Sequence, residues 1–236
     1  MAATVAVLGG GTGGVVSANI LSKTLPRSNN RIVLIDRKES HHFQGAYPSI
    51  LANQRRPAQI TRKLTRLSRK GIEVWQAEVE KLLPEQRLVE TDRGLLEYDY
   101  LIISLGAEYH PETVPGMAEG SYNPWSFEGA CRLQQKLLQL REGRIVLFIA
   151  SLPFICPPAP YEVMFLLDAF YRLRGLRGQV ELTLITPEPG PEPLAGPKVG
   201  ESVRRMLEQR GIEFISEAKI LKLDGENKVL HLDHGI

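Results

Sequence analysis

Short apolar runs alternate with a helical segment at the start of the chain. Residues 4–8 and 31–35 are largely apolar runs, which is typical of parallel strands buried on both faces. Between them, residues 15–25 have a helical period that places three apolar side chains on one face, namely Val16, Ile20 and Leu21. The pattern predicts a strand, a turn, a helix and a second strand.

The following segment adds two more strands and a meander. Residues 60–70 form a predicted basic helix, which either presents a solvated face or attracts an anionic surface. Gly71 leads from this helix into a strand at residues 72–75. Three apolar positions then mark a β-meander, namely Leu82, Val89 and Leu95. A last apolar run, residues 100–104, closes near Gly106.

The same order of elements returns in the second half of the chain. Residues 144–150 lie 140 positions after residues 4–10, and Arg210-Gly211-Ile212 repeats Lys70-Gly71-Ile72 at the same offset. Each copy continues into a meander that closes near a glycine, Gly94 in one copy and Gly235 in the other. A repeat of this kind indicates two related α/β units.

A glycine turn joins the first strand to the first helix. Gly9, Gly11 and Gly14 match the G-x-G-x-x-G pattern, which allows a tight turn, a close approach to a pyrophosphate and close packing of helix on strand. Thr12 and Gly13 complete the turn. Asp36 ends the next strand, where a carboxylate can accept hydrogen bonds from ribose hydroxyls. The alternative is a turn that only packs a helix on a sheet.

The second copy has lost these features. At the offset of 140, Ile149, Ser151 and Phe154 stand where the three glycines would lie. At an offset of 150, which aligns the second strands, Thr186 replaces Asp36. Side chains at these positions would keep a pyrophosphate away from the backbone, so we expect no NAD(P)H site in the second copy.

A cysteine occupies the corresponding turn of the second copy. Cys156 precedes Pro160, which suits an early helical position, and a helix N-terminus favours a thiolate. Glu162 lies in the first turn of that helix and is a candidate proton acceptor. The alternatives are a buried structural cysteine and a carboxylate that only offsets the helix dipole.

We therefore predict an α/β fold of two Rossmann-like, three-layer units with β-meander insertions, the second inserted in the first and incomplete. The expected domains are 1–125, which binds a dinucleotide, and 126–236, which lacks the glycine fingerprint. The chain stops before a strand equivalent to residues 100–104, so we expect a piece of a longer protein.

Composition excludes several classes of function. The 236 residues carry a net charge of +2, which gives no reason to expect nucleic acid as a partner. Two cysteines form no disulfide framework and favour a reducing, cytoplasmic location. No signal peptide is expected from the first residues, and no apolar stretch reaches the ~18 residues that span a bilayer. His41 and His42 have no partner at a metal-ligand spacing, so no metal is expected.

The sequence resembles the sulfide:quinone oxidoreductases and the flavoprotein subunit of flavocytochrome c sulfide dehydrogenase. The matching stretches cover most of the chain and include residues 7–14, Asp36-Arg37, Tyr47-Pro48-Ser49, 105–109 and 186–189. The stretch at residues 153–162 also matches, and its part from Cys156 to Glu162 is the most specific, because many flavoproteins share the glycine fingerprint.

The resemblance implies FAD in the first unit and a redox-active Cys156 facing the flavin, with Glu162 close by. It also implies sulfide as the electron donor, quinone as the acceptor and a second essential cysteine beyond Ile236. Four further residues are expected to contact the cofactor, namely Arg37, Pro48, Val79 and Gly106. Val79 is equally well explained as a core residue. Some members of the family carry an additional cysteine upstream of the one that faces the flavin. Cys131 does not coincide with that position, and we predict that it lies on the core-facing side of a helix.

Several properties of the whole protein follow only as expectations. In the family, C-terminal helices absent from this chain reach the membrane, so the full-length protein is expected in the cytoplasm or on the inner face of the cell membrane. A homo-oligomer is left open. Two other functions remain as alternatives: a type II NADH:quinone dehydrogenase-like flavoprotein, and a catalytically silent FAD-binding fragment. The 236 residues alone are expected to be inactive.

Overall fold

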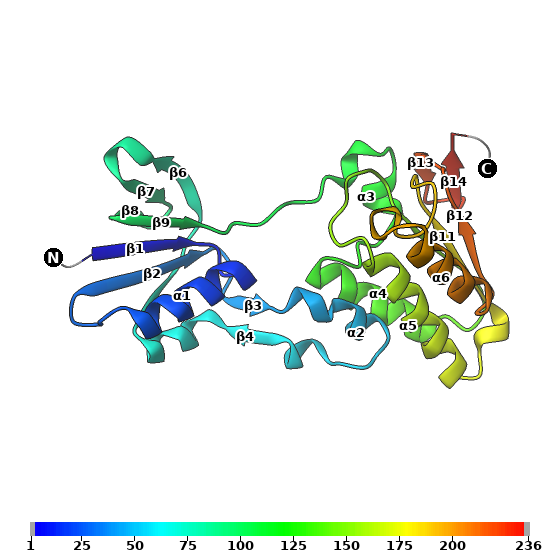
Figure 1. Ribbon diagram of the computed structural model, residues 1–236, viewed down its shortest axis with the longest axis horizontal. Coiled ribbons are helices and arrows are strands. Elements are labelled where there is room, and N and C mark those ends of the chain that lie inside the picture. Colours follow the sequence, from blue (N-terminus) through cyan, green and yellow to red (C-terminus); the bar gives the residue numbers. More distant parts are fainter. Residues whose placement is uncertain (1–2, 234–236) are drawn as a thin grey trace. The chain divides into compact units, whose positions relative to one another are not determined.

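The structure, a computed structural model, describes residues 3–233 (Figure 1). These residues form two compact units. Unit 1 contains residues 3–43 and 57–108, and unit 2 contains residues 44–56 and 109–233. The units reflect contacts within the chain, whereas the predicted boundary after residue 125 separates two repeats, so that boundary stays a prediction.

Unit 1 is built on a parallel sheet with strand order β5-β2-β1-β9. Its strands and the helix that follows the first of them are β1 Ala3–Leu8, α1 Thr12–Thr24, β2 Asn30–Asp36, β5 Ile72–Gln76 and β9 Tyr100–Ile103. The predicted meander is confirmed as β6 Val79–Leu83, β7 Leu88–Thr91 and β8 Gly94–Glu97. Short 3₁₀ helices cover Pro57–Gln59 and Pro84–Gln86.

Both faces of this sheet are buried. One face packs Val5, Val7 and Ile32 against Ala18 of α1 and Leu64, and the other packs a second set of strand residues against the meander. That second set comprises Ala6, Leu8, Val33 and Ile35, with Val89, Leu96 and Tyr98 from the meander side. Alternate residues of β1 and β2 thus serve opposite layers, which explains why both strands are apolar throughout.

Two details of the first unit were predicted wrongly. Residues 60–70 are not a helix throughout, because Thr61–Lys63 forms strand β4 against β3 (Ser40–His42), and only Leu64–Lys70 is helical, as a 3₁₀ helix. On α1 the buried residues are Gly14 and Ala18, whereas Val16 and Ile20 are 50% and 56% exposed. Of the three predicted residues only Leu21 packs against the core of the sheet, where it is partly buried together with Val15.

Unit 2 contains a parallel sheet with strand order β10-β11-β12. Its strands are β10 Gly143–Phe148, β11 Val180–Ile185 and β12 Ile212–Ile215, followed by the hairpin β13 Ile220–Asp224 and β14 Val229–Leu232. Its helices are α2 Tyr47–Leu51, α3 Met117–Gly120, α4 Phe127–Gln139, α5 Ala159–Leu173 and α6 Pro197–Glu208. Short 3₁₀ helices cover Gln44–Ala46, Pro111–Thr113, Arg177–Gln179 and Pro193–Ala195.

The internal repeat is confirmed at the level of single hydrogen bonds. The amide of Gly9 donates to Ile35 at 2.8 Å, and the amide of Ile149 donates to Ile185 at 2.9 Å. The meanders match as well, because both Asp92 and Asp233 accept a backbone N–H from the residue before the first meander strand, at 2.9 and 3.0 Å. The closing glycine of the second copy, Gly235, lies outside the described residues.

A buried carboxylate holds the end of α5 to the second sheet. The side chain of Asp168 is 5% exposed and accepts hydrogen bonds from Arg172 Nε at 2.8 Å and Arg177 Nε at 2.7 Å. Arg177 also donates to the backbone oxygens of Val180, Arg210 and Gly211, at 2.7, 2.7 and 2.9 Å. This arginine therefore connects α5 to the residues that begin β11 and β12.

We predict that Asp168→Asn lowers the free energy of unfolding by about 3 kcal/mol, because it leaves Arg177 charged, mostly buried and without its carboxylate. The matched control is Glu181→Gln, which breaks the exposed ion pair between Arg144 and Glu181 and should cost less than about 1 kcal/mol. Urea unfolding followed by circular dichroism measures both. Equal losses in the two variants would contradict this role for Asp168.

Candidate functional site

Two glycines of the first turn are required by close packing. Gly9 has a φ of +100°, which side chains rarely adopt, and a Cβ there would overlap the carbonyl oxygen of Ser104. A Cβ on Gly14 would overlap the carbonyl oxygen of Gly9. The first and last glycines of the pattern therefore bring α1 against the ends of β1 and β9.

The middle glycine faces open space. A Cβ on Gly11 would have no heavy atom within 4 Å, and Gly11 caps α1 without a side-chain hydrogen bond or an acidic residue in the first turn. Thr12 and Gly13 are exposed beside it. The free N–H groups and positive end of α1 thus border an open approach, which is the geometry that binds a phosphate group.

The carboxylate of Asp36 fixes this turn. One of its oxygens accepts the N–H of Gly10 at 2.5 Å, and the other accepts the N–H of Lys38 at 2.6 Å. Each oxygen keeps a further lone pair for a ligand hydroxyl. The next residue, Arg37, is held by Glu108 at 2.9 Å and Glu78 at 3.3 Å, and these carboxylates raise its pKa.

The sequence did not reveal the part that His41 plays at this turn. Its Nδ1 lies 3.0 Å from the carbonyl oxygen of Gly10, so this nitrogen carries the hydrogen and donates it. His41 and Asp36 together hold both backbone polar groups of Gly10. The only signal in the sequence was the position of His41, five residues after Asp36 in the hairpin strand β3.

The three remaining residues predicted to contact the cofactor lie outside the glycine turn. Gly106 follows β9 with a φ of +82° and open space at its Cβ position. The side chain of Val79 is partly buried and packs against the core between sheet and meander. Pro48 is buried in α2 and belongs to unit 2. Contact of these three residues with a cofactor stays a prediction.

In unit 2 the turn after β10 presents the predicted thiol. Cys156 is exposed and has a φ of +62°, a left-handed conformation that costs a residue with a side chain about 1–3 kcal/mol. Its carbonyl oxygen accepts the N–H of Ala159 at 3.0 Å, which leads directly into α5. Glu162 is exposed in the first turn of α5. The structure therefore places both residues at the N-terminal end of one helix.

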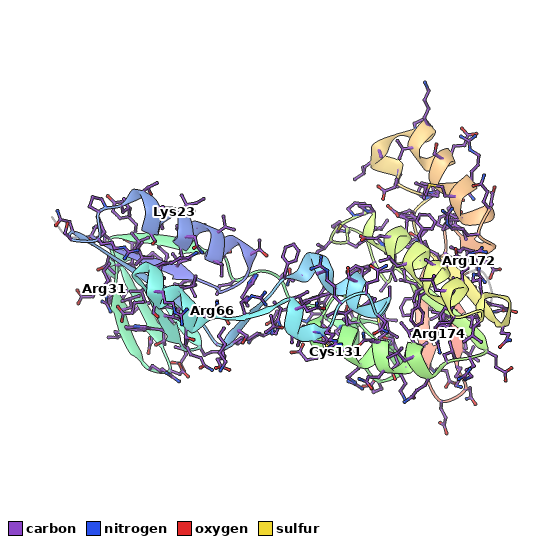
Figure 2. The ribbon with its side chains drawn as sticks, turned by 90° about the horizontal axis from the view of Figure 1, so that it is seen from below. Lys23, Arg31, Arg66, Cys131, Arg172 and Arg174 are labelled. Atoms are coloured by element: carbon purple, nitrogen blue, oxygen red, sulfur yellow. The ribbon has the colours of Figure 1, made fainter. Side chains whose placement is uncertain are left out.

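The other cysteine has a different environment. Cys131 lies half-buried in α4 of unit 2 and is labelled in Figure 2. Burial raises the pKa of its thiol, and the Glu128 carboxylate raises it further. A thiol with a raised pKa is a poor nucleophile at neutral pH. This agrees with the predicted structural role of Cys131.

The position equivalent to Asp36 is filled by a buried polar group of another kind. Thr186 is fully buried, and its hydroxyl lies 3.3 Å from a carboxyl oxygen of Glu188 and accepts the Glu188 N–H at 3.1 Å. Burial raises the pKa of Glu188; the bond from Thr186 opposes this shift, and the Glu192 carboxylate adds to it. At the position of Asp36 the second copy thus has a buried hydroxyl group, which is bonded to the enclosed Glu188.

Among the described residues, 3–233, no three His, Cys, Asp or Glu side chains come together as metal ligands, and no helix is both long and apolar enough to cross a membrane.

Comparison with known proteins gives consistent matches. Residues 3–148 match the model of the pyridine nucleotide-disulphide oxidoreductase family. The chain is 30% identical to the sulfide-quinone reductase of Aquifex aeolicus over 242 residues, covering 99% of this chain and 55% of that protein. The mitochondrial sulfide:quinone oxidoreductase of Mus musculus is 27% identical over 188 residues, covering 77% of this chain and 41% of that protein.

Comparison of the fold with solved structures finds a related protein as well. The crystal structure of the Aquifex aeolicus sulfide:quinone oxidoreductase superimposes with a TM-score of 0.87 at 26% identity, covering 98% of this chain and 56% of that one. A type II NADH:quinone oxidoreductase from Staphylococcus aureus is 23% identical, covering 97% of this chain and 60% of that protein. The chain thus spans about half the length of the relatives that it matches.

We predict that Gly14→Ala lowers the free energy of unfolding of unit 1 by about 2–3 kcal/mol, because the new methyl group meets the backbone of Gly9. Gly11→Ala is the matched control. Its methyl group enters open space at a φ of −71°, so its cost should stay within about 1 kcal/mol. Thermal unfolding compares the two variants, and equal destabilisation would contradict the separate roles assigned to these glycines.

A second prediction concerns pH. Because the pKa of Glu188 is raised in the folded protein, its contribution to stability is present below the pKa of the unfolded chain and is lost as pH rises through the folded-state pKa. Glu188→Gln, which cannot ionise, should therefore be more stable than the wild type at neutral pH, with the difference shrinking in acid. Urea unfolding at several pH values measures this, and a difference that grows in acid would refute it.

Proposed function

The chain belongs to the pyridine nucleotide-disulphide oxidoreductase family, and from this premise we propose that it is part of an FAD-dependent oxidoreductase that oxidises sulfide through Cys156 and passes the electrons through flavin to a quinone. The observation that carries the proposal is the contrast between the two copies. The first copy keeps the complete glycine turn, whereas the second copy has an exposed thiol in its place.

The residues of the first copy fit FAD. The open approach at Gly11 and the uncapped N-terminus of α1 would hold the pyrophosphate, and the free lone pairs of Asp36 would accept ribose hydroxyls. Thr12, Gly13 and Gly106 would line the same approach. FAD, when bound, would supply the acceptor for an electron pair from sulfur and the donor to a quinone.

The second copy supplies the sulfur chemistry in this proposal. Hydrosulfide attacks one sulfur of an oxidised cysteine pair, a new sulfur–sulfur bond forms, the bond between the cysteines breaks, and the other cysteine leaves as a thiolate. Cys156 is one member of the pair, and the second is expected beyond residue 236. The attacked cysteine becomes a persulfide, whose proton Glu162 would accept. FAD, when bound, would supply the two-electron oxidant for the next step, in which the Cys156 thiolate and the persulfide would join in a new sulfur–sulfur bond and release two electrons.

An alternative is a type II NADH:quinone oxidoreductase, the class of the Staphylococcus aureus relative. That activity needs a nicotinamide site. In the second copy, however, buried Ile149 stands in place of the first glycine and Thr186, bonded to Glu188, in place of the ribose-binding acid. These side chains support the sulfide proposal over the NADH one. The silent FAD-binding fragment stays an alternative for the 236 residues alone.

If a quinone accepts the electrons, as we propose, the full-length protein would work at a membrane surface. The part that would reach the membrane is expected outside the 236 residues, and a peripheral location on the inner face of the cell membrane is proposed on that basis.

We predict that Cys156→Ala in the full-length protein slows flavin reduction by sulfide at least about 100-fold, because the thiolate that delivers the electron pair is removed. Anaerobic stopped-flow absorbance of the flavin measures this rate. Cys131→Ala is the matched control and should stay within about twofold of the wild type, because the Cys131 thiol is half-buried with a raised pKa. If the Cys156 variant is reduced as fast as the wild type, this assignment is wrong.

A further inference from the structure

An open cavity of about 500 Å³ lies in unit 2 at the end of α5 farthest from Cys156. It is lined by side chains of α5 and by residues that follow α6, namely Phe165, Asp168, Ala169, Arg172, Gln209 and Arg210. Its volume falls in the range of small-molecule sites. None of these residues takes part in the proposed sulfide chemistry, so the cavity needs a separate explanation.

The cavity carries more positive than negative charge. Asp168 is the one acid among its lining residues, and buried Arg177 already balances this carboxylate at 2.7 Å. Arg172, at 2.8 Å from Asp168, and Arg210, at 3.9 Å, add two further charges. The C-terminal ends of α5 and α6 offset part of this excess, which still leaves a net positive wall.

The hydrogen-bond donors of the three arginines are used very differently. Arg177 makes four hydrogen bonds, one to Asp168 and three to backbone oxygens. Within residues 3–233, Arg172 donates only through Nε, and Arg210 donates only through Nη1, to Met206 at 3.0 Å. Both Nη groups of Arg172 and Nη2 of Arg210 therefore remain for a ligand. Figure 2 shows Arg172 near the end of α5.

An aromatic ring adds an apolar wall to the cavity. The guanidinium carbon of Arg210 lies over the Phe165 ring, 5.0 Å from its centroid. Ala169 lies on the same helix, one turn further on. A ligand with a small apolar or aromatic body could pack on this wall while its charged group meets the arginines.

We propose that this cavity binds a phosphate group with two negative charges, carried by a small phosphorylated molecule. Two guanidinium groups with donors to spare match a dianion in charge, and arginine binds phosphate through paired N–H groups. The carboxylate of Asp168 does not oppose the ligand fully, because Arg177 and Arg172 hold its two oxygens. This is a binding site for an anion, separate from the sulfide site.

Isothermal titration calorimetry of the full-length protein tests the proposal, with inorganic phosphate and phenyl phosphate as probes. The titrations are made at mildly alkaline pH, where both are dianions, and at constant ionic strength set with sodium chloride. We expect saturable binding of both, with phenyl phosphate binding more tightly because its ring packs on Phe165. Absence of saturable binding by either probe would overturn the proposal.

Variants locate the site. Arg172→Ala should weaken phenyl phosphate binding about tenfold or more, since it removes charge-assisted hydrogen bonds. Arg172→Lys keeps the ion pair with Asp168 but loses the paired donors, and should also weaken binding, which keeps the test valid if the alanine variant fails to fold. Arg205→Ala, an exposed cation of α6 outside the cavity lining, should stay within about twofold. Equal weakening by Arg205→Ala and Arg172→Ala would mean unspecific charge attraction and would refute the site.

Discussion

The first unit depends on one steric constraint, the absence of side chains where α1 meets the ends of β1 and β9. Gly14 packs on the backbone of Gly9, and Gly9 packs on the backbone of Ser104, so neither position accepts a Cβ. This contact brings the N-terminus of α1 to the carboxyl end of the sheet, with Gly11 facing open space. Asp36 and His41 then hold the N–H and the carbonyl oxygen of Gly10, so side chains fix this turn on both sides.

The second copy shows what happens when the same backbone plan is kept without that constraint. The strand register and the hydrogen bond at the strand end are retained, but the turn widens to carry Cys156 in a left-handed conformation. Buried Thr186, bonded to Glu188, stands at the position of Asp36. One repeat therefore keeps an open glycine turn while the other exposes a thiol, and the proposed path of electrons from sulfur to flavin rests on this difference.

Much of this arrangement was predictable, because it depends on local rules. The strands followed from apolar runs, and the tight turn at Gly9 and the close packing at Gly14 followed from the spacing of the glycines. The buried face of α1 could not be predicted in the same way. Its fully buried residues are small ones such as Ala18, whereas Val16 and Ile20 are exposed. His41, Asp168 and Arg177 gained their roles from tertiary contacts between distant segments, which no local pattern in the sequence encodes.

The central claim is that electrons enter through the thiol of the second copy and not through a nicotinamide bound there. The most direct measurement is an anaerobic titration of the full-length, flavin-loaded protein with sulfide and, separately, with NADH, following the flavin absorbance. The account predicts stoichiometric bleaching by sulfide and none by NADH on the same timescale. Bleaching by NADH with no response to sulfide would contradict it.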